Sequence, residues 1–431
     1  MAKRLNFASA DFLDAFERLL GSKREADSDV HDAVAGIIAD IRGRGDDALL
    51  AFTAKYDGLA VGSVAELALS ADMLQAALDA LDDDLRQSLE LAAARIQAFH
   101  KRQRPNGFAY TDEAGVELAL RHTAVDAVGL YVPGGKAAYP SSVLMNAIPA
   151  MVAGVKRRVM VVPARDGDVN ELVLAAAALA GVTEVWRIGG AQAVAALAYG
   201  TQTIAPVDKI VGPGNAFVAA AKRQVFGQVG IDSIAGPSEI LVVADAHNDP
   251  AWIAADLLSQ AEHDEAAQSI LITDDAAFAD AVDKAVSTML PTLDRAAVAG
   301  QSWQDNGAII TVPHMDEMPA IADRIAAEHL ELALDNAEEW AEKITHAGAI
   351  FLGRYTPEAI GDYVAGPNHV LPTARTARFS SGLGVADFMK RTTMVSCDAS
   401  SFAQIAPAGV ALADAEGLGA HALSMRIRMN H

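Results

Sequence analysis

Short runs rich in β-branched residues alternate with alanine-rich stretches of helical length through most of the chain after residue 124. The runs cover residues 127–131, 158–163, 184–188, 209–211, 240–244, 269–273, 308–312 and 349–352. Strands joined through helices form parallel βαβ units, because a parallel pair needs a long crossover connection. Helices then cover both faces of each sheet. We therefore predict an α/β fold of two doubly wound, Rossmann-like lobes with parallel sheets.

The segment before residue 120 has a different pattern. Amphipathic stretches rich in alanine and leucine lie near residues 10–20, 29–56 and 71–100, which indicates helices. With 431 residues, 52% of them hydrophobic, the chain can bury at least two cores. We expect an N-terminal helical segment (1–24), a main α/β domain (25–129 with 238–380), an inserted α/β lobe (130–237) and a C-terminal tail (381–431).

The charge and cysteine content exclude several kinds of partner and site. A formal net charge of -22 repels polyphosphate backbones, and the largest lysine/arginine run is residues 156–158. We therefore expect no nucleic-acid partner, although backbone N–H groups at helix N-termini still permit a nucleotide cofactor. The single cysteine, Cys397, excludes an intrachain disulfide framework and a cysteine-rich metal site.

Hydropathy gives no sign of a membrane segment. Apolar stretches such as residues 172–182 are shorter than the ~18 residues that cross a bilayer. Residues 11–17 are acidic, where a signal peptide would be apolar. We predict a cytoplasmic protein without a membrane partner.

Three of the strand runs lead directly into glycine turns and then into helices. The turns are VPGG at 132–135, GGAQ at 189–192 and GPGN at 212–215. Open α/β sheets bind ligands at the carboxyl ends of their strands, where glycine lets the backbone approach a bulky charged group. We predict one nucleotide crevice lined by all three turns. None of them has the full GxGxxG fingerprint, and such turns also serve as simple connectors.

Pairs that join a carboxylate or carboxamide to an imidazole recur in the C-terminal half. They are Gln260 with His263, Glu328 with His329, Asp362 with His369, and Glu416 with His421. Oxygen and nitrogen donors of these kinds serve both metal binding and proton transfer. Gln260 and His263 are three apart on an expected helix and so share a face. We expect Glu328 and His329 on a helix too, with side chains about 100° apart. A single pair can be purely structural, but the recurrence indicates an enzyme.

Longer strings around these positions resemble one protein family. The strings are GPGNAFVAAAKR, AGPSEILVVAD, DLLSQAEHD, RIAAEHLEL, GDYVAGPNHVLPT, SGLGVADFMKR and AEGLGAH. In order and spacing they are similar to the histidinol dehydrogenase family, and the resemblance runs from about residue 25 to the C-terminus. Several of the strings are too long to match by coincidence.

The resemblance implies an NAD- and zinc-dependent enzyme of histidine biosynthesis. Its reaction would be the four-electron oxidation of L-histidinol to L-histidine through L-histidinal, with two NAD as oxidants. Glu328 and His329 match the acid/base pair of the family. The matching zinc ligands, which also border the substrate, are Gln260, His263, Asp362 and His421. In the family the last of these comes from the second subunit of a homodimer.

The resemblance also assigns the contacts of substrate and cofactor. The further substrate contacts match Ser238, His369 and Glu416, together with the base His329. The NAD contacts match Tyr131, Gln192 and Asn215. These three lie on or beside the three glycine turns, so the inserted lobe would bind NAD. The tail would complete the partner subunit's site.

Two other functions deserve comparison with this one. A paralogous zinc- and NAD-dependent alcohol dehydrogenase that acts on a sulfonated diol would use the same metal and acid/base residues. A sulfonate favours cations where the family has Glu416, so the acidic residue fits an amine or imidazolium substrate better. A metal-dependent hydrolase would keep a water on the metal and would not bind NAD.

Overall fold

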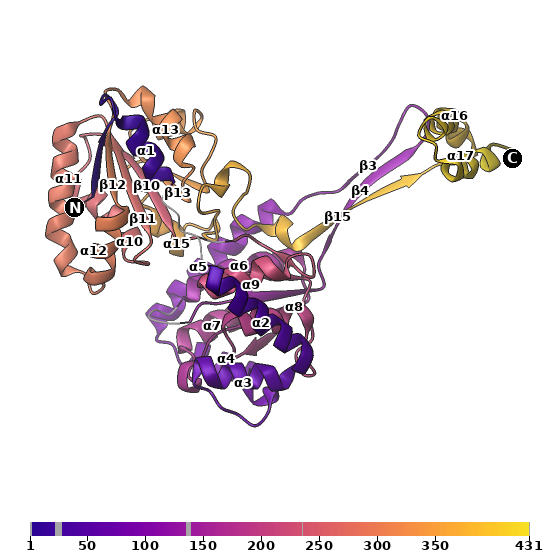
Figure 1. The fold of residues 1–431 in the computed structure, drawn as a ribbon, viewed down its shortest axis with the longest axis horizontal. Coiled ribbons are helices and arrows are strands. Elements are labelled where there is room, and N and C mark those ends of the chain that lie inside the picture. The colour runs from indigo at the N-terminus through magenta and orange to yellow at the C-terminus, as the bar shows by residue number, and fades with distance from the viewer. Residues whose placement is uncertain (1, 22–27, 135–138, 235, 431) are drawn as a thin grey trace.

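The computed structural model describes residues 2–21, 28–134, 139–234 and 236–430. Gly135 of the first glycine turn lies outside the described residues. Within them the chain forms two α/β lobes, each built on a six-stranded sheet, and a long arm that leaves both lobes (Figure 1). The parallel pairing that dominates both sheets confirms the predicted α/β class.

One lobe is built on a sheet that we call the β10 sheet, whose order is β1-β12-β11-β10-β13-β14. All its neighbouring strands pair in parallel. The strands are β1 (Lys3–Asn6), β10 (Glu239–Ala244), β11 (Gln268–Thr273), β12 (Ala308–Thr311), β13 (His329–Ala333) and β14 (Ala349–Leu352). The helices are α1 (Phe12–Leu20), α10 (Pro250–Ala261), α11 (Ala276–Met289), α12 (Ala296–Asn306), α13 (Met318–Ile325), α14 (Ala337–Ala341) and α15 (Glu358–Tyr363).

Strand β10 shows why this lobe has helices on both faces. All six of its residues are buried, and successive side chains of a strand point to opposite faces. Leu241 and Val243 join an apolar cluster with α1 and α13, whereas Ile240 and Val242 join a second cluster with α10 and α11. A strand that is apolar on both faces needs a helical layer on each, which is the doubly wound arrangement.

The other lobe is built on the β5 sheet, whose order is β2-β7-β6-β5-β8-β9. Its strands are β2 (Ala68–Leu69), β5 (Ala127–Tyr131), β6 (Arg157–Val161), β7 (Glu184–Trp186), β8 (Lys209–Val211) and β9 (Gly230–Ile231). Only β2 among them pairs antiparallel. The helices are α2 (Ser28–Arg44), α3 (Asp46–Asp57), α4 (Ala71–Asp79), α5 (Asp83–Gln103), α6 (Pro140–Ala153), α7 (Glu171–Leu179), α8 (Gly190–Tyr199) and α9 (Ala216–Val225).

The strand order of the β5 sheet reverses beside β5. From β5 the chain proceeds to β6 and β7 on one side, then returns to β8 and β9 on the other. Such a reversal opens a crevice at the carboxyl ends of the strands, because the helices that follow them lie on opposite faces. The three predicted glycine turns follow β5, β7 and β8 at this edge.

A third, antiparallel sheet of order β15-β4-β3 forms the arm. It consists of β3 (Phe108–Thr111), β4 (Glu117–Ala124) and β15 (Met389–Ser396), and it carries α16 (Ala399–Ala415) and α17 (Gly419–Arg426) at its far end (Figure 1). A short 3-10 turn, Ile427–Asn430, follows α17, and others span Val64–Leu67, Arg165–Gly167, Leu290–Thr292, Met315–Glu317, Thr376–Arg378 and Val385–Phe388. None of the helices in the described ranges combines the length and apolarity that crossing a membrane requires.

The sheets divide the N-terminal half differently from the domain division predicted above. Residues 25–129 were expected to join the body of residues 238–380, but β2 pairs with β7, and α2 packs on α8 and α9. Within the expected N-terminal helical segment, 1–24, β1 extends the β10 sheet beside β12. An amphipathic pattern specifies which face of a helix is buried, but not the layer that buries it.

Candidate active site

Most of the side chains predicted for catalysis and metal binding converge at one edge of the β10 sheet. Ser238 precedes β10, and Glu328 precedes β13, which begins at His329. Gln260 lies in the last turn of α10 and His263 just after it, Asp362 lies in α15, and His369 lies in the following loop. This is the edge at the amino ends of the parallel strands. Ligands of open α/β sheets usually bind at the opposite, carboxyl edge. Helices α10 and α15 reach this edge because each runs back antiparallel to the strand before it.

The loop that carries His369 is anchored to the other lobe. The side chain of Asn368 is buried, and its Nδ2 donates to the carbonyl of Met145 in α6 at 2.6 Å. Asn368 Oδ1 accepts from Val370 N–H at 2.8 Å. Thus the packing of the two lobes on each other positions His369.

Glu328 and His329 are both held by the backbone of Glu239, the first residue of β10. Glu239 N–H donates to Glu328 Oε2 at 2.9 Å, and Glu239 C=O lies 3.0 Å from His329 Nδ1. A carbonyl oxygen can only accept, so this contact puts the imidazole proton on Nδ1 and leaves the lone pair on Nε2. His329 Nε2 is buried and has no hydrogen-bond partner. It is therefore available as a base.

The prediction that Glu328 and His329 lie on a helix is wrong. Helix α13 ends at Ile325, because Ala326 adopts a left-handed conformation with φ 48°, and β13 begins at His329. The string AAEHLEL has helix-forming residues, but parallel pairing of β13 with both β10 and β14 outweighs that propensity. As a result both side chains contact the backbone of Glu239, whereas on a helix they would diverge.

Burial dominates the electrostatics of this pair. It raises the pKa of Glu328 well above its ordinary value, and the nearby acidic side chains of Glu239, Asp362 and Glu358 raise it further. Burial also lowers the pKa of His329 to about 4, although Asp362 opposes that shift. At neutral pH the imidazole is therefore unprotonated, which is the form that can accept a proton.

The predicted metal ligands from one chain supply suitable donors. Asp362 Oδ1 lies 3.5 Å from His369 Nδ1. Burial by itself raises the pKa of Asp362, but the imidazoles of His369, His329 and His263 lower it to about 2, so the carboxylate is ionised at neutral pH. Gln260 is completely buried, its Nε2 contacts His263 Nδ1 at 3.2 Å, and its Oε1 has no partner. A buried oxygen without a donor, beside an ionised carboxylate and imidazoles, fits a borderline cation such as zinc.

Sequence reasoning missed Glu358, which belongs to the same cluster. Its Oε1 is buried, lacks a hydrogen-bond partner and lies 3.6 Å from His329 Nε2. One ligand atom each from His329, Glu358 and Asp362 lie within 4.8 Å of one another, a spacing that could hold a metal ion. Burial and the neighbouring Asp362 raise the pKa of Glu358 to about 9. Its position four residues before Asp362 on one helix face was the signal available in the sequence.

Glu416 and His421 are not brought to this cluster within one chain. Both are exposed on the helical end of the arm, Glu416 just after α16 and His421 in α17. The arm carries them away from both lobes (Figure 1). A single chain therefore assembles only part of the predicted site.

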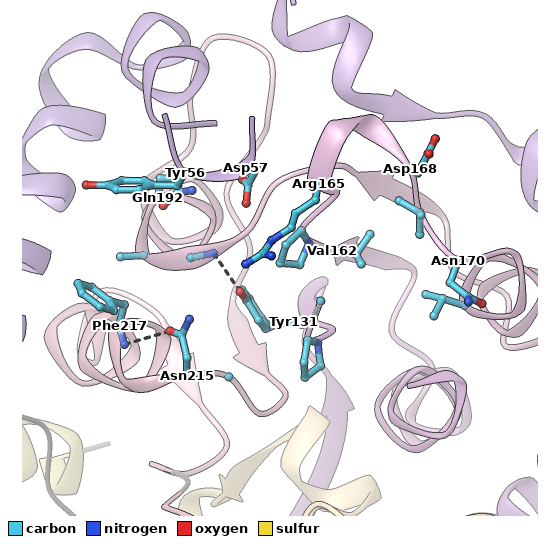
Figure 2. A pocket seen from close by; sticks show the side chains of 18 of the residues that line it. Tyr56, Asp57, Tyr131, Val162, Arg165, Asp168, Asn170, Gln192, Asn215 and Phe217 are labelled. Atoms are coloured by element: carbon cyan, nitrogen blue, oxygen red, sulfur yellow. Dashed lines mark hydrogen bonds between the residues drawn. The ribbon is translucent and has the colours of Figure 1, made fainter. Parts of the chain in front are cut away.

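A cavity of about 540 Å³ lies at the carboxyl edge of the β5 sheet, in the crevice predicted from the glycine turns. Tyr131, Gln192 and Asn215 all line it (Figure 2). Tyr131 Oη accepts from Gly190 N–H at 2.9 Å, and burial raises the pKa of Tyr131 to about 12. Asn215 caps α9 by accepting from Phe217 and Val218 N–H groups.

The buried side chain of Gln192 indicates which kind of ligand suits the cavity. Its side chain is 2% exposed, and Nε2 has no hydrogen-bond partner. A buried amide without a partner costs about 1–3 kcal/mol, which a ligand that accepts its hydrogen bond would recover. The cavity therefore fits a ligand with hydroxyl or carbonyl groups, such as a nucleotide. Sequence reasoning missed Tyr56, Asp57 and Arg165, which also line it.

Comparison with known proteins decides the family. A model of the histidinol dehydrogenase family matches residues 21–429. The chain belongs to the histidinol dehydrogenase family. It is 65% identical over 431 residues to histidinol dehydrogenase of Rhodospirillum rubrum, covering 100% of this chain and 99% of the relative. It is 61% identical over 430 residues to that of Ruegeria pomeroyi, with 100% and 99% covered.

A solved structure agrees with this assignment. The crystal structure of histidinol dehydrogenase from Elizabethkingia anophelis matches with a TM-score of 0.94 at 34% identity, covering 100% of this chain and 98% of that chain. Because histidinol dehydrogenases are oxidoreductases, the predicted enzyme class is confirmed. Neither the sulfonated-diol paralogue nor the hydrolase gains support from these comparisons.

Proposed function

We propose that this enzyme oxidises L-histidinol to L-histidine through L-histidinal, with NAD as the oxidant and zinc as the bound metal. The observation that carries the proposal is the His329 imidazole, which Glu239 holds with a free Nε2 close to Asp362. A neutral base can accept the proton of an alcohol, and cation-binding donors beside it can hold a metal that orients an amino alcohol. Membership of the histidinol dehydrogenase family supports the substrate.

The chain's own residues would move the protons of both oxidation steps. His329 Nε2 accepts the proton of the substrate alcohol in the first step and that of the aldehyde hydrate in the second. Glu328 assists the addition of water to the aldehyde between them. A cation on Asp362 would offset the repulsion between Asp362 and Glu328, and so favour the ionised Glu328 that this addition needs. NAD, when bound, accepts the hydride that the substrate carbon loses in each step.

Gln260, His263 and Asp362 would hold the zinc ion together with His421 of a second copy of the chain. Zinc, when bound, would fix the substrate in place, since orienting the reacting groups removes several kcal/mol of barrier. Ser238, His369 and Glu416 would contact the substrate as well. Tyr131, Gln192 and Asn215 would bind NAD in the cavity of the lobe that includes residues 130–237.

The arm supports a homodimer in which residues 381–431 complete the site of the second copy. Large apolar side chains on it are exposed, among them Phe108 (56%), Val395 (66%), Leu412 (66%) and Leu423 (58%). Large apolar side chains gathered on one exposed extension are typical of protein interfaces. A second chain would bury these residues, and Glu416 and His421 would complete its active site. The isolated monomer would therefore be inactive.

We place the enzyme in the cytoplasm. The single cysteine suits a reducing compartment, where disulfides are rare.

The amount of NADH formed per histidinol consumed tests the proposed function. We expect a ratio of about two for the purified enzyme, because the aldehyde stays bound until the second oxidation. Prior chelation should abolish NADH formation, and added zinc should restore it. A ratio near one would indicate that the aldehyde escapes, and no NADH at all would contradict the proposed function.

Mixing two inactive variants tests the shared site. His329→Asn removes the base of a chain's own site, whereas His421→Asn removes the ligand that a chain supplies to its partner. A mixed dimer of the two then has one intact site, so dimers reassembled from equal amounts should regain about a quarter of wild-type activity. Each variant alone is the control. If the mixture stays inactive while copurification of differently tagged chains shows mixed dimers, each tail serves its own chain.

A further inference from the structure

Asp57 is the last residue of α3 and lines the dinucleotide cavity beside Tyr56 (Figure 2). Its side chain is half-buried, and its Oδ2 is shielded from water without a hydrogen-bond partner. Burial raises the pKa of Asp57, although the Gly189 N–H and the Arg165 guanidinium lower it in part. The carboxylate therefore borders the cavity and keeps one acceptor without a partner.

The position of this carboxylate is unfavourable for the fold itself. Carbonyl groups at the C-terminus of a helix repel an anion, by roughly 0.3–1 kcal/mol at exposed positions. Asp57 stands at that end of α3, where cations are favoured instead. An unpartnered acceptor at a destabilising position points to a ligand that donates hydrogen bonds to it.

The neighbours of Asp57 indicate which part of a dinucleotide would lie there. Tyr56 is 51% exposed and borders the same cavity, and its ring, which contacts Phe52 and Lys55 Nζ, would meet an adenine base along its exposed part. Gln192 Nε2 is an unused donor. In Figure 2 Asp57 and Arg165 point into the same part of the cavity. A ribose next to adenine has hydroxyl groups that both donate and accept, which matches an acceptor from Asp57 and a donor from Gln192.

We propose that Asp57 binds the hydroxyl groups of the adenosine ribose and thereby selects NAD over NADP. A carboxylate accepts a hydrogen bond from the 2′-hydroxyl but repels a 2′-phosphate. Asp168 adds a second negative charge to the cavity, whose only described cation is Arg165. This assignment rests on the proposed NAD dependence of the enzyme.

Direct binding measurements on the full chain without substrate test the assignment. The ligands are NAD, its 2′-deoxy analogue and NADP, titrated by calorimetry into wild type, Asp57→Ala, Asp57→Asn and the control Asp168→Ala. Wild type should bind the 2′-deoxy analogue about tenfold more weakly than NAD, because an acceptor is left unpaired. Asp57→Ala should bind both equally, whereas Asp168→Ala should keep the difference.

Asp57→Asn separates hydroxyl recognition from charge. Its amide oxygen still accepts a hydrogen bond, so it should keep part of the preference for NAD over the 2′-deoxy analogue. Removing the charge should raise NADP affinity about tenfold, because Arg165 then meets the 2′-phosphate without a competing carboxylate. Equal binding of NAD and the analogue by wild type would overturn the role of Asp57 alone. Absence of NAD binding to wild type would overturn the proposed function with it.

Discussion

Replacing His329 by asparagine is expected to lower kcat for histidinol oxidation by roughly 10²–10⁴-fold, the range that a positioned base contributes. The amide of asparagine can still donate to the carbonyl of Glu239, as His329 Nδ1 does over 3.0 Å. It has no counterpart of the imidazole Nε2 that accepts the proton. The structural contact should therefore survive while the chemistry is lost. Rapid-mixing measurement of NADH formation in a single turnover would show the effect on the chemical step.

The control for this variant is His247→Asn. The side chain of His247 is 79% exposed, and it contacts Asp245 away from the predicted site residues. Its substitution should leave kcat unchanged. NAD affinity should be unchanged in both variants, since neither residue lines the cavity at the carboxyl edge of the β5 sheet. Retention of more than about a tenth of kcat by His329→Asn would assign proton transfer to another group.

Replacing Asp362 by alanine is expected to weaken zinc binding at least roughly 100-fold, because loss even of a residue that only orients a ligand costs 10–100-fold. Asp362 is the only anionic donor of the set proposed from one chain, and its pKa of about 2 keeps it ionised. Protein purified after mild chelation should then contain much less zinc than wild type, measured by atomic emission. NADH formation should fall in proportion to the metal content.

Glu358→Gln distinguishes the two possible ligand sets. The proposed set comprises Gln260, His263 and Asp362, whereas distance alone also allows His329, Glu358 and Asp362. With the proposed set, Glu358→Gln should retain about one zinc per chain under the same chelation, since Gln260, His263, Asp362 and the His421 of a second copy would hold the ion without Glu358. If this variant loses zinc as Asp362→Ala does, Glu358 is a ligand. Thermal unfolding of both variants would separate metal loss from loss of the fold.

Several elements of the fold were predictable because local signals agreed with tertiary packing. Helix α10 begins where Asp249 caps it, accepting from Ala251 N–H at 2.9 Å, and Pro250 occupies its first turn. Gln260 and His263 then share a face three residues apart, as the spacing predicts. The glycine turns after β5, β7 and β8 predicted the cavity, because the carboxyl ends of parallel strands share one edge.

Other features depend on contacts between distant segments. Glu328 and His329 were expected on a helix, but pairing with β10 extends them into a strand and its entrance. The four-residue spacing of Glu358 and Asp362 was a weak local signal and Asp57 had none, since an acidic residue on an amphipathic helix is usually solvent-facing. In the folded chain, neighbouring elements bury one carboxylate oxygen of Glu358 and one of Asp57 without giving either a hydrogen-bond partner.

The amino-acid sequence by itself determined the parallel α/β class, the position of the crevice at the glycine turns and the chemistry of the candidate donors. These follow from periodicity, turn residues and side-chain type, all of which act within a few residues. Only the tertiary structure decided that most of the predicted acid/base and metal residues gather at the amino edge of the β10 sheet, that α2 to α5 cover the β5 sheet, and that the arm leaves the body. The physical reason is that a local pattern is compatible with several packing partners for a helix or strand. Burial and strand pairing between residues far apart in the sequence decide which of these partners it contacts.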